Sequence, residues 1–185
     1  MKILEPILWH KMQNGIIEGE GVKHTKKYLK DIFKIYKANY KLEGIDDNTV
    51  MYEVYSYSEG KEVPGNLNWG LTVMSPVRIN GECNMTKGHY HEDRNCVEYY
   101  FGISGEGLLL YMNIAGEMWA EKILPGSLHY IDGNLAHRLV NIGDSQLKVG
   151  ACWPSSAGHN YEDVEKKEFP ERIYKESGEI VFKDR

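Results

Sequence analysis

The pattern of apolar and polar positions changes in character near residue 49. Over residues 25–37, apolar side chains recur at helical spacing from Leu29 to Tyr36, which predicts an amphipathic helix with Thr25 as its N-cap. After residue 49, short runs rich in aromatic and β-branched residues alternate with turn signals and predict strands. These runs are 51–57, 67–74, 97–101, 108–112, 118–124 and 147–153, with a last strand near 180–182.

Many short strands that are separated by turns favour an antiparallel sandwich or barrel over a doubly wound sheet. We expect an all-β jelly-roll barrel over residues 49–161, with one or a few peripheral helices. Residues 1–48 then form an N-terminal extension that carries the helix, and residues 162–185 form a charged tail around the barrel. A length of 185 residues, with no repeat or linker in the pattern, fits a single domain.

Composition and charge narrow the classes of function. The formal net charge is −5 and the charged residues are interspersed, so the chain offers no basic surface for nucleic acid or an anionic membrane. The 3 cysteines have no CxxC spacing, which favours a reducing compartment. Glu5 and Pro6 interrupt the apolar N-terminus, and no stretch approaches membrane-spanning length. We expect a cytoplasmic protein with neither nucleic acid nor membrane as its partner.

A pattern typical of a metal site lies in the middle of the chain. His89 and His91 are two residues apart, so in a strand their imidazoles point to one face. Glu98 opens the next strand, and an antiparallel pairing would bring its carboxylate to the same face. His137 begins another strand, on the far side of a closed barrel. Three imidazoles and one carboxylate suit Fe(II), Mn(II), Ni(II) or Zn(II) and can leave positions open for substrate oxygens.

The motifs around these residues resemble the cupin motifs, over residues 86–107 for the first and 125–141 for the second. A closer similarity is to the cupin-type phosphoglucose isomerases, known mainly from archaea and a few bacteria, and it spans the chain from Tyr52 to Tyr161. The motifs that carry it are Thr86-Lys-Gly-His-x-His, Glu98-x-Tyr100, Ala136-His-Arg-x-Val-Asn-Ile-Gly143 and Pro154-x-x-Ala-Gly-His-x-Tyr161.

This resemblance implies a metal-dependent homodimer that interconverts glucose 6-phosphate and fructose 6-phosphate, a reaction of glycolysis and gluconeogenesis. It implies one divalent metal ion per subunit, Fe(II) in first place, with Mn(II), Ni(II) or Zn(II) as alternatives. Glu98 and Tyr100 are the candidate catalytic residues, since a base is needed near C1 and C2 of the open-chain sugar. The implied metal ligands are His89, His91, Glu98 and His137, and the implied sugar-phosphate contacts are Tyr52, Thr72, Thr86, Gly88, Tyr100, His159 and Tyr161.

Two details qualify the resemblance. Trp153 stands where the Tyr-Pro step of the family has a tyrosine, so an indole N–H, which can only donate, replaces a hydroxyl. Lys87 shares strand parity with His89, whereas Thr86 and Gly88 do not. Contacts to a sugar phosphate from the latter two therefore require a backbone N–H or a bulge.

Two other functions stay open at this point. A non-haem iron cupin dioxygenase uses the same set of three histidines and one glutamate, and a non-enzymatic sugar-binding cupin would have the same cavity without turnover. Oxygen consumption would indicate the dioxygenase, and tight sugar binding with no metal requirement would indicate the binding cupin. Three further histidines lack a ligand pattern: His10 and His24 lie outside the predicted barrel, and His129 is predicted to be a hydrogen-bonded structural histidine.

Overall fold

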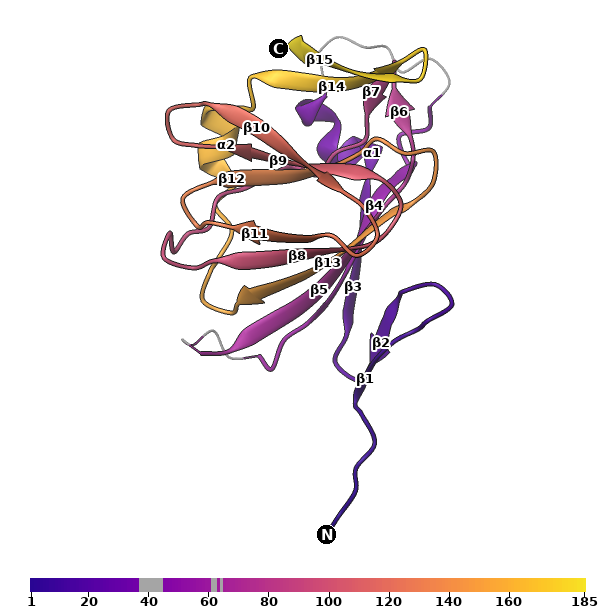
Figure 1. Cartoon of the computed structure of the whole chain (residues 1–185), viewed down its shortest axis with the longest axis vertical. Coiled ribbons are helices and arrows are strands. Elements are labelled where there is room, and N and C mark those ends of the chain that lie inside the picture. Colours follow the sequence, from indigo (N-terminus) through magenta and orange to yellow (C-terminus); the bar gives the residue numbers. More distant parts are fainter. Residues whose placement is uncertain (37–44, 61–62, 64) are drawn as a thin grey trace.

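The chain forms two facing antiparallel β-sheets, the jelly-roll barrel that the strand pattern predicts (Figure 1). The computed structural model describes residues 1–36, 45–60, 63 and 65–185. The 6-stranded sheet consists, in spatial order, of β11 (Leu128–Ile131), β8 (Glu98–Ser104), β13 (Leu147–Pro154), β5 (Leu67–Met74), β4 (Val50–Tyr57) and β3 (Lys23–Tyr28). The 3-stranded sheet consists of β10 (Met118–Ile123), β9 (Gly107–Met112) and β12 (Ala136–Asn141).

The inward-facing side chains of both sheets form the core. In β8, Glu98 and Tyr100 are buried whereas Tyr99 and Phe101 are exposed. This period of two is expected of a strand with one face toward the barrel and the other toward solvent. β12 is buried at every position, and Phe169 of the C-terminal segment packs against Arg138 in this strand. The interior of the barrel is therefore where β8 and β12 can bring polar side chains together.

The helix expected over residues 25–37 is wrong in its first part. Residues 25–28 belong to β3, which pairs with β4 from Lys23↔Ser56 to Tyr28↔Val50. The helix is confined to α1 (Leu29–Ile32) and a following 3-10 turn, Phe33–Ile35, and Tyr28 rather than Thr25 stands at its N-cap. Residue 37 lies outside the described residues. Lysine is a good helix former, but intrinsic propensity is a weak preference, and here the pairing with β4 decides the conformation. The sheet thus begins before residue 49.

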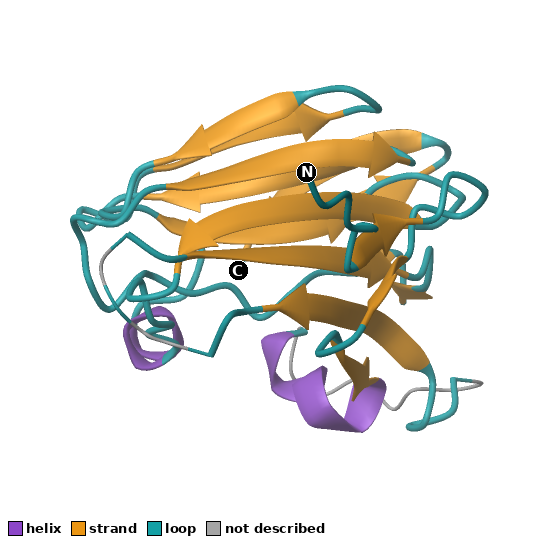
Figure 2. Ribbon diagram, turned by 90° about the horizontal axis from the view of Figure 1, so that it is seen from below, coloured by secondary structure: helices purple, strands orange, loops and turns teal. Residues whose placement is uncertain are grey.

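The C-terminal segment packs beside the barrel and adds a second small sheet. α2 (Glu162–Lys166) is followed by the hairpin β14 (Glu171–Glu176) and β15 (Glu179–Asp184), which includes the strand predicted near 180–182. The hairpin joins β7 (Glu82–Cys83) and β6 (Arg78–Ile79) in the order β15-β14-β7-β6. Figure 2 shows the helices outside the stacked strands, along one side of them.

A separate N-terminal hairpin, β1 (Leu8–His10) and β2 (Ile17–Gly19), lies against the 6-stranded sheet. There the indole N–H of Trp69 on β5 donates to Nε2 of His10 over 2.7 Å. The residues before β1 extend away from the body of the molecule (Figure 1). Among the described residues, no helix has the length and apolar character needed to cross a membrane.

Candidate metal centre

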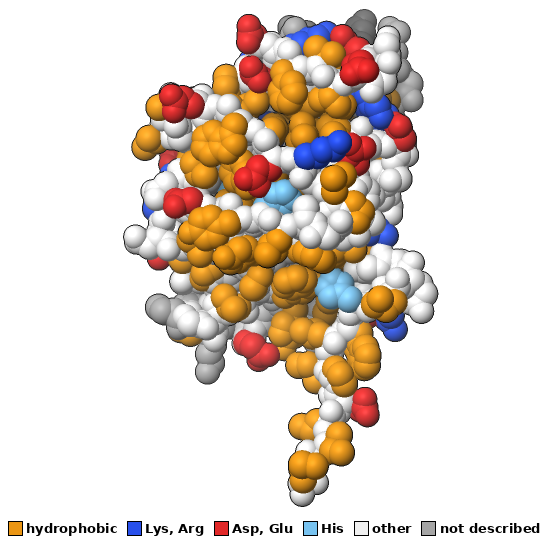
Figure 3. Space-filling view, viewed as in Figure 1, with side chains coloured by type: hydrophobic (Ala, Val, Ile, Leu, Met, Phe, Trp, Pro, Cys, Tyr) orange, Lys and Arg blue, Asp and Glu red, His pale blue; other side chains and the backbone are white. Residues whose placement is uncertain are grey.

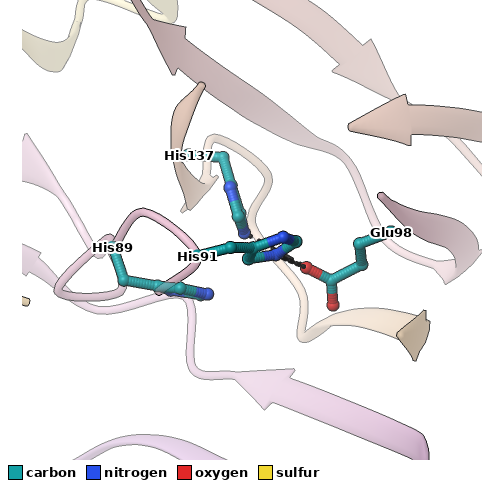
Figure 4. Close-up of side chains that lie close together, drawn as sticks. All are labelled: His89, His91, Glu98 and His137. Carbon is teal, nitrogen blue, oxygen red and sulfur yellow. Dashed lines mark hydrogen bonds and ion pairs between the residues drawn. The ribbon is translucent and has the colours of Figure 1, made fainter. Parts of the chain in front are cut away.

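Three separate parts of the chain bring His89, His91, Glu98 and His137 together inside the barrel (Figure 4). Glu98 begins β8 and His137 is the second residue of β12, as the sequence predicts. The segment with His89 and His91 is not the regular strand that we expected. It makes isolated bridges, His89↔His137 and Tyr90↔Asn160, because Gly88 turns the backbone with a φ of 77°.

The four side chains converge on one point. One ligand atom from each of them can be chosen so that all four atoms lie within 4.8 Å of one another. Glu98 Oε2 is 3.2 Å from Nε2 of His91 and 3.2 Å from Nε2 of His137, where only the His91 contact has hydrogen-bond geometry. The ring centroids of His89 and His137 are 4.4 Å apart. The spacing therefore fits a single ion.

Backbone carbonyls orient two of the imidazoles. Nδ1 of His91 lies 2.8 Å from the carbonyl oxygen of Cys96, and Nδ1 of His137 lies 3.2 Å from that of Leu135. A carbonyl oxygen only accepts, so Nδ1 carries a proton, and in the neutral imidazole the lone pair then lies on Nε2, the atom that faces Glu98. This tautomer is the one that a metal ion requires.

Burial and mutual contacts shift the pKa values in the cluster. Burial acts to raise the pKa of Glu98, but the imidazoles of His137 and His91 outweigh it and hold that pKa below its usual value. Burial, followed by the nearby His137, lowers the pKa of His89 well below its usual value. Burial also acts to lower the pKa of His91, but contacts with Glu98 and the Cys96 carbonyl raise it overall. The cluster thus contains an ionised carboxylate and a neutral imidazole, the forms that bind metals.

The cluster fits a divalent metal ion better than it fits a self-sufficient hydrogen-bond network. Nε2 of His89 is buried and has no hydrogen-bond partner among the described residues. A buried polar atom without a partner is costly, and such atoms are rare in native proteins. Three imidazole nitrogens and one carboxylate oxygen form a donor set that suits Fe(II), Mn(II), Ni(II) and Zn(II).

An open cavity of about 310 Å³ leads from the barrel mouth to this cluster. His89 and Glu98 line it, whereas His91 and His137 lie behind its surface. All of the substrate contacts predicted from the sequence line the same cavity: Tyr52, Thr72, Thr86, Gly88, Tyr100, His159 and Tyr161.

The structure also places residues in the cavity wall that the sequence did not suggest. Thr25 and Lys27 reach it from β3, and Ser56 reaches it from β4. Thr25 and Lys27 were missed because they fell in the predicted helix. Their spacing of two residues, which puts both on one face of a strand, was the signal that could have revealed them.

The parity difficulty at Thr86, Lys87 and Gly88 is resolved by the irregular backbone. All three residues line the cavity, because Gly88 has a positive φ and no strand alternation holds here. Thr86 Oγ1 accepts a hydrogen bond of 3.0 Å from the N–H of Leu139, which leaves its own O–H proton free to donate. This segment therefore presents several donors to the cavity.

Trp153 lines the cavity as well, on the strand next to Gly70. A Cβ added at Gly70 would lie 2.9 Å from the indole ring, so only glycine leaves room for it. The ring centroids of Trp153 and His159 are 6.4 Å apart. The residue that departs from the family pattern thus forms part of the wall, and Gly70 accommodates its size.

Of the remaining histidines, His24 does not lie outside the barrel as predicted, because β3 extends the 6-stranded sheet through it. Nδ1 of His129 lies 2.6 Å from Glu121 Oε2 and its Nε2 lies 2.8 Å from Ser127 Oγ, which confirms a hydrogen-bonded structural histidine. His10 lies in the N-terminal hairpin, and His24 in β3 pairs with Glu53 over 2.6 Å. None of the three lines the cavity.

Comparison with known proteins agrees with this geometry. The family described as "Glucose-6-phosphate isomerase (GPI)" matches residues 24–184. A glucose-6-phosphate isomerase from Thermococcus litoralis is 34% identical over 174 residues, which are 93% of this chain and 90% of that protein. One from Sinorhizobium medicae is 31% identical over 169 residues, covering 89% and 78%.

Among solved structures, an oxalate oxidase matches with a TM-score of 0.51 and 13% identity, over 68% of this chain and 63% of that one. A similarity at this identity supports the cupin fold alone. The family match and the relatives extend over most of the chain and include the whole cavity wall. The chain belongs to the glucose-6-phosphate isomerase family, within the cupin fold.

Proposed function

We propose that the chain is a metal-dependent isomerase that interconverts glucose 6-phosphate and fructose 6-phosphate. The observation that carries this proposal is the cluster of three histidines and Glu98 at the end of a cavity large enough for a sugar phosphate. The family match favours this activity over the dioxygenase and over a binding cupin without turnover.

In this proposal, His89, His91, Glu98 and His137 bind the metal ion. Bound there, a divalent cation would act as a Lewis acid on the sugar oxygens at C1 and C2. Glu98 lines the cavity, so its carboxylate can accept a proton from the open-chain sugar. Tyr100 shares the inward face of β8, and a phenol with a pKa of about 10 in model compounds remains protonated at neutral pH and donates.

The phosphate group would bind to a part of the cavity wall that the metal ligands do not form. Thr72 and Thr86 supply hydroxyls, Gly88 supplies a backbone N–H, and Lys87 and Lys27 supply positive charge. Tyr52, His159 and Tyr161 complete the wall and can position the sugar hydroxyls. The side-chain nitrogen of Lys87 lies 5.9 Å from the ring centroid of Tyr161, on the same part of the wall.

We further propose Fe(II) as the native metal ion and a cytoplasmic role in glycolysis and gluconeogenesis, where both sugar phosphates occur. The mixed donor set of the cluster supports iron together with Mn(II), Ni(II) and Zn(II). Metal analysis of the purified protein, followed by reconstitution with each ion, ranks the four. A larger activity with another ion would overturn the assignment of iron.

We also propose that the chain forms a homodimer. The outer face of β8 and β11 exposes Tyr99, Phe101, Leu128 and Tyr130, with exposed fractions of 46%, 40%, 64% and 51%. They form two cross-strand pairs, Tyr99↔Tyr130 and Phe101↔Leu128, and Figure 3 shows apolar side chains gathered on this side of the molecule. An apolar patch on an edge of a sheet supports a symmetric contact. Sedimentation equilibrium that shows a monomer would contradict it.

A coupled assay tests the activity. The metal-loaded protein is supplied with fructose 6-phosphate, and glucose 6-phosphate is detected through its dehydrogenase. We expect turnover that disappears on chelation and returns with the metal ion. A folded, metal-loaded protein that converts neither sugar phosphate would overturn the proposal, and oxygen consumption with an organic substrate would identify the dioxygenase.

A further inference from the structure

Arg138 is a buried cation that lies directly behind the wall of the cavity. Its exposed fraction is 6%, and no carboxylate of the described residues forms an ion pair with it. A guanidinium remains charged at neutral pH even when it is buried. A buried charge without a partner destabilises a protein. Arg138 is therefore compensated by a carbonyl, a thioether and an aromatic ring rather than by an ion pair.

The guanidinium is held in a fixed orientation by three contacts. Nη2 donates to the backbone carbonyl of Lys87, and Nη1 lies 3.2 Å from Sδ of Met85. The guanidinium carbon stacks 4.4 Å from the ring centroid of Phe169. Arg138 therefore joins β12 to the cavity segment on one side and to the C-terminal segment on the other.

The Lys87 carbonyl lies at the point where the backbone pairing between the cavity segment and β12 is interrupted. Before it, the N–H of Thr86 donates to the carbonyl of Leu139 over 2.9 Å. After it, the N–H of His89 donates to the carbonyl of His137 over 3.2 Å. Between these bonds the Arg138 side chain replaces the missing backbone partner.

This contact determines where the next N–H points. In a trans peptide the C=O and N–H groups point in opposite directions, and the structure has no cis bond among the described residues. With its carbonyl directed to Arg138, the Lys87–Gly88 peptide directs the Gly88 N–H away from the guanidinium, and Gly88 itself lines the cavity. That N–H makes no hydrogen bond to a described residue.

The backbone at Gly88 leaves little freedom for another arrangement. Its φ is 77°, and a Cβ added there would lie 3.0 Å from Nε of Arg138 and 3.1 Å from the ring of Phe169. The glycine is thus required both by its backbone conformation and by the arginine behind it.

We propose that Arg138 is a positioning residue for anion binding: by holding the Lys87 carbonyl, it fixes and polarises the Gly88 N–H as a donor to the phosphate group of the substrate. The inference rests on the proposed function, because it takes the phosphate from the sugar-phosphate substrate. Arg138 touches neither the substrate nor the metal ion. Its charge strengthens the donor through the peptide, as preorganised dipoles do in other anion sites.

The test compares two ligands of zinc-loaded protein by calorimetry: a phosphorylated five-carbon sugar acid and the same acid without phosphate. In Arg138→Met, we expect the affinity for the phosphorylated acid to fall about tenfold or more, the size of a lost hydrogen bond to a charged group. The affinity for the unphosphorylated acid and the zinc content should remain as in the wild type. Arg138→Lys, which keeps the charge but loses the planar fork, should recover part of the loss.

Arg172→Met is the matched control. Arg172 is also buried, at 5% exposed, but it pairs with Glu82 over 2.7 Å and does not line the cavity. We expect lower stability and an unchanged ratio of the two affinities. If Arg138→Met weakens both ligands equally, or changes only the stability, its role is structural and the proposal is overturned.

A measurement on the wild-type protein keeps the test valid if Arg138→Met does not fold. On titration of the zinc-loaded protein with inorganic phosphate, the amide resonance of Gly88 should shift with the same midpoint as binding. Phosphate binding that leaves this resonance unchanged would overturn the proposal. The coupled isomerase assay tests the proposed function separately. If the wild type is active and Arg138→Met does not change the ratio of the two ligand affinities, the positioning role is refuted and the proposed function stands.

Discussion

The Oε2 atom of Glu98 lies 3.2 Å from Nε2 of His137, and this contact joins β8 of the 6-stranded sheet to β12 of the 3-stranded sheet. Both side chains are almost completely buried, at 5% and 1% exposed. The two sheets of the barrel therefore meet at the metal cluster, and the position of each ligand depends on the packing of the whole barrel.

Replacement of His137 by alanine should abolish metal binding under conditions that saturate the wild type. The change removes one of four donors, which is also a direct neighbour of both Glu98 and His89. Loss of an outer-shell partner alone costs about tenfold to 100-fold in metal affinity, and loss of a ligand should exceed this. Metal content after gel filtration and turnover in the coupled assay measure the effect.

His129→Gln is the control for the loss of a buried histidine. It breaks the contacts with Glu121 and Ser127, away from the cavity, so we expect a loss of about 1 kcal/mol in unfolding free energy with full metal content. Full activity in metal-free His137→Ala would contradict the site.

Removal of the metal ion should lower the thermal stability. A ligand that binds only the folded state at 100 times its dissociation constant adds about 2.7 kcal/mol, which for a chain of this size corresponds to a shift of about 5–10 °C in Tm. Calorimetric scans of chelated and reloaded protein measure the difference. Identical scans, with metal uptake confirmed, would mean that the buried cluster does not bind the ion.

Much of the barrel could be predicted from the sequence because its strands alternate. The strands 51–57, 67–74 and 118–124 differ from β4, β5 and β10 by at most one residue at an end. The metal ligands could be found for a related reason, since imidazoles and a carboxylate carry a chemical signal that apolar residues lack.

The errors arise where distant parts of the chain decide the local structure. The lysines of β3 carry no strong strand signal, and they become a strand through pairing with β4. The sequence does not distinguish Arg138 from an ordinary basic residue, because its hydrogen-bond partner Lys87 is 51 positions away in the chain. Neither relationship can be deduced from local periodicity.

Lys27 should contribute to substrate affinity although the sequence did not suggest it. It lines the cavity and forms no ion pair with a described residue, so Lys27→Gln removes positive charge from the rim. We expect KM for fructose 6-phosphate to rise by about two- to tenfold with little change in kcat, and the difference to shrink at high salt because a rim charge is screened. Steady-state kinetics at two ionic strengths measure this.

The neighbouring Lys26→Gln is its matched control. Lys26 lies on the same strand but on the other face, where its Nζ is 3.5 Å from Glu53 Oε2, and it does not line the cavity. We expect KM to stay within error of the wild type. Equal effects of the two substitutions would indicate general electrostatic attraction rather than a contact in the cavity.

Tyr100→Phe should reduce kcat without unfolding the protein. Tyr100 is 9% exposed and lines the cavity, so removal of its hydroxyl leaves the shape of the wall but takes away a donor next to Glu98. A positioned proton donor contributes about 10²–10⁴-fold to rate, and we expect a loss in this range with unchanged metal content. If kcat is unchanged, Tyr100 is only a part of the wall.

Trp153 and Gly70 should be coupled in substrate binding. A Cβ at Gly70 would lie 2.9 Å from the indole ring, so Gly70→Ala must displace Trp153 from the wall of the cavity. We expect Gly70→Ala alone to raise KM several-fold, whereas in the background of Trp153→Leu, which leaves room for the methyl group, the same change should have little further effect. The coupling energy from this double-mutant cycle should be about 0.5–3 kcal/mol, the range for residues in contact. Additive effects of the two substitutions would show that Gly70 acts independently of the indole. Gly70 would then not be needed to make room for the ring of Trp153.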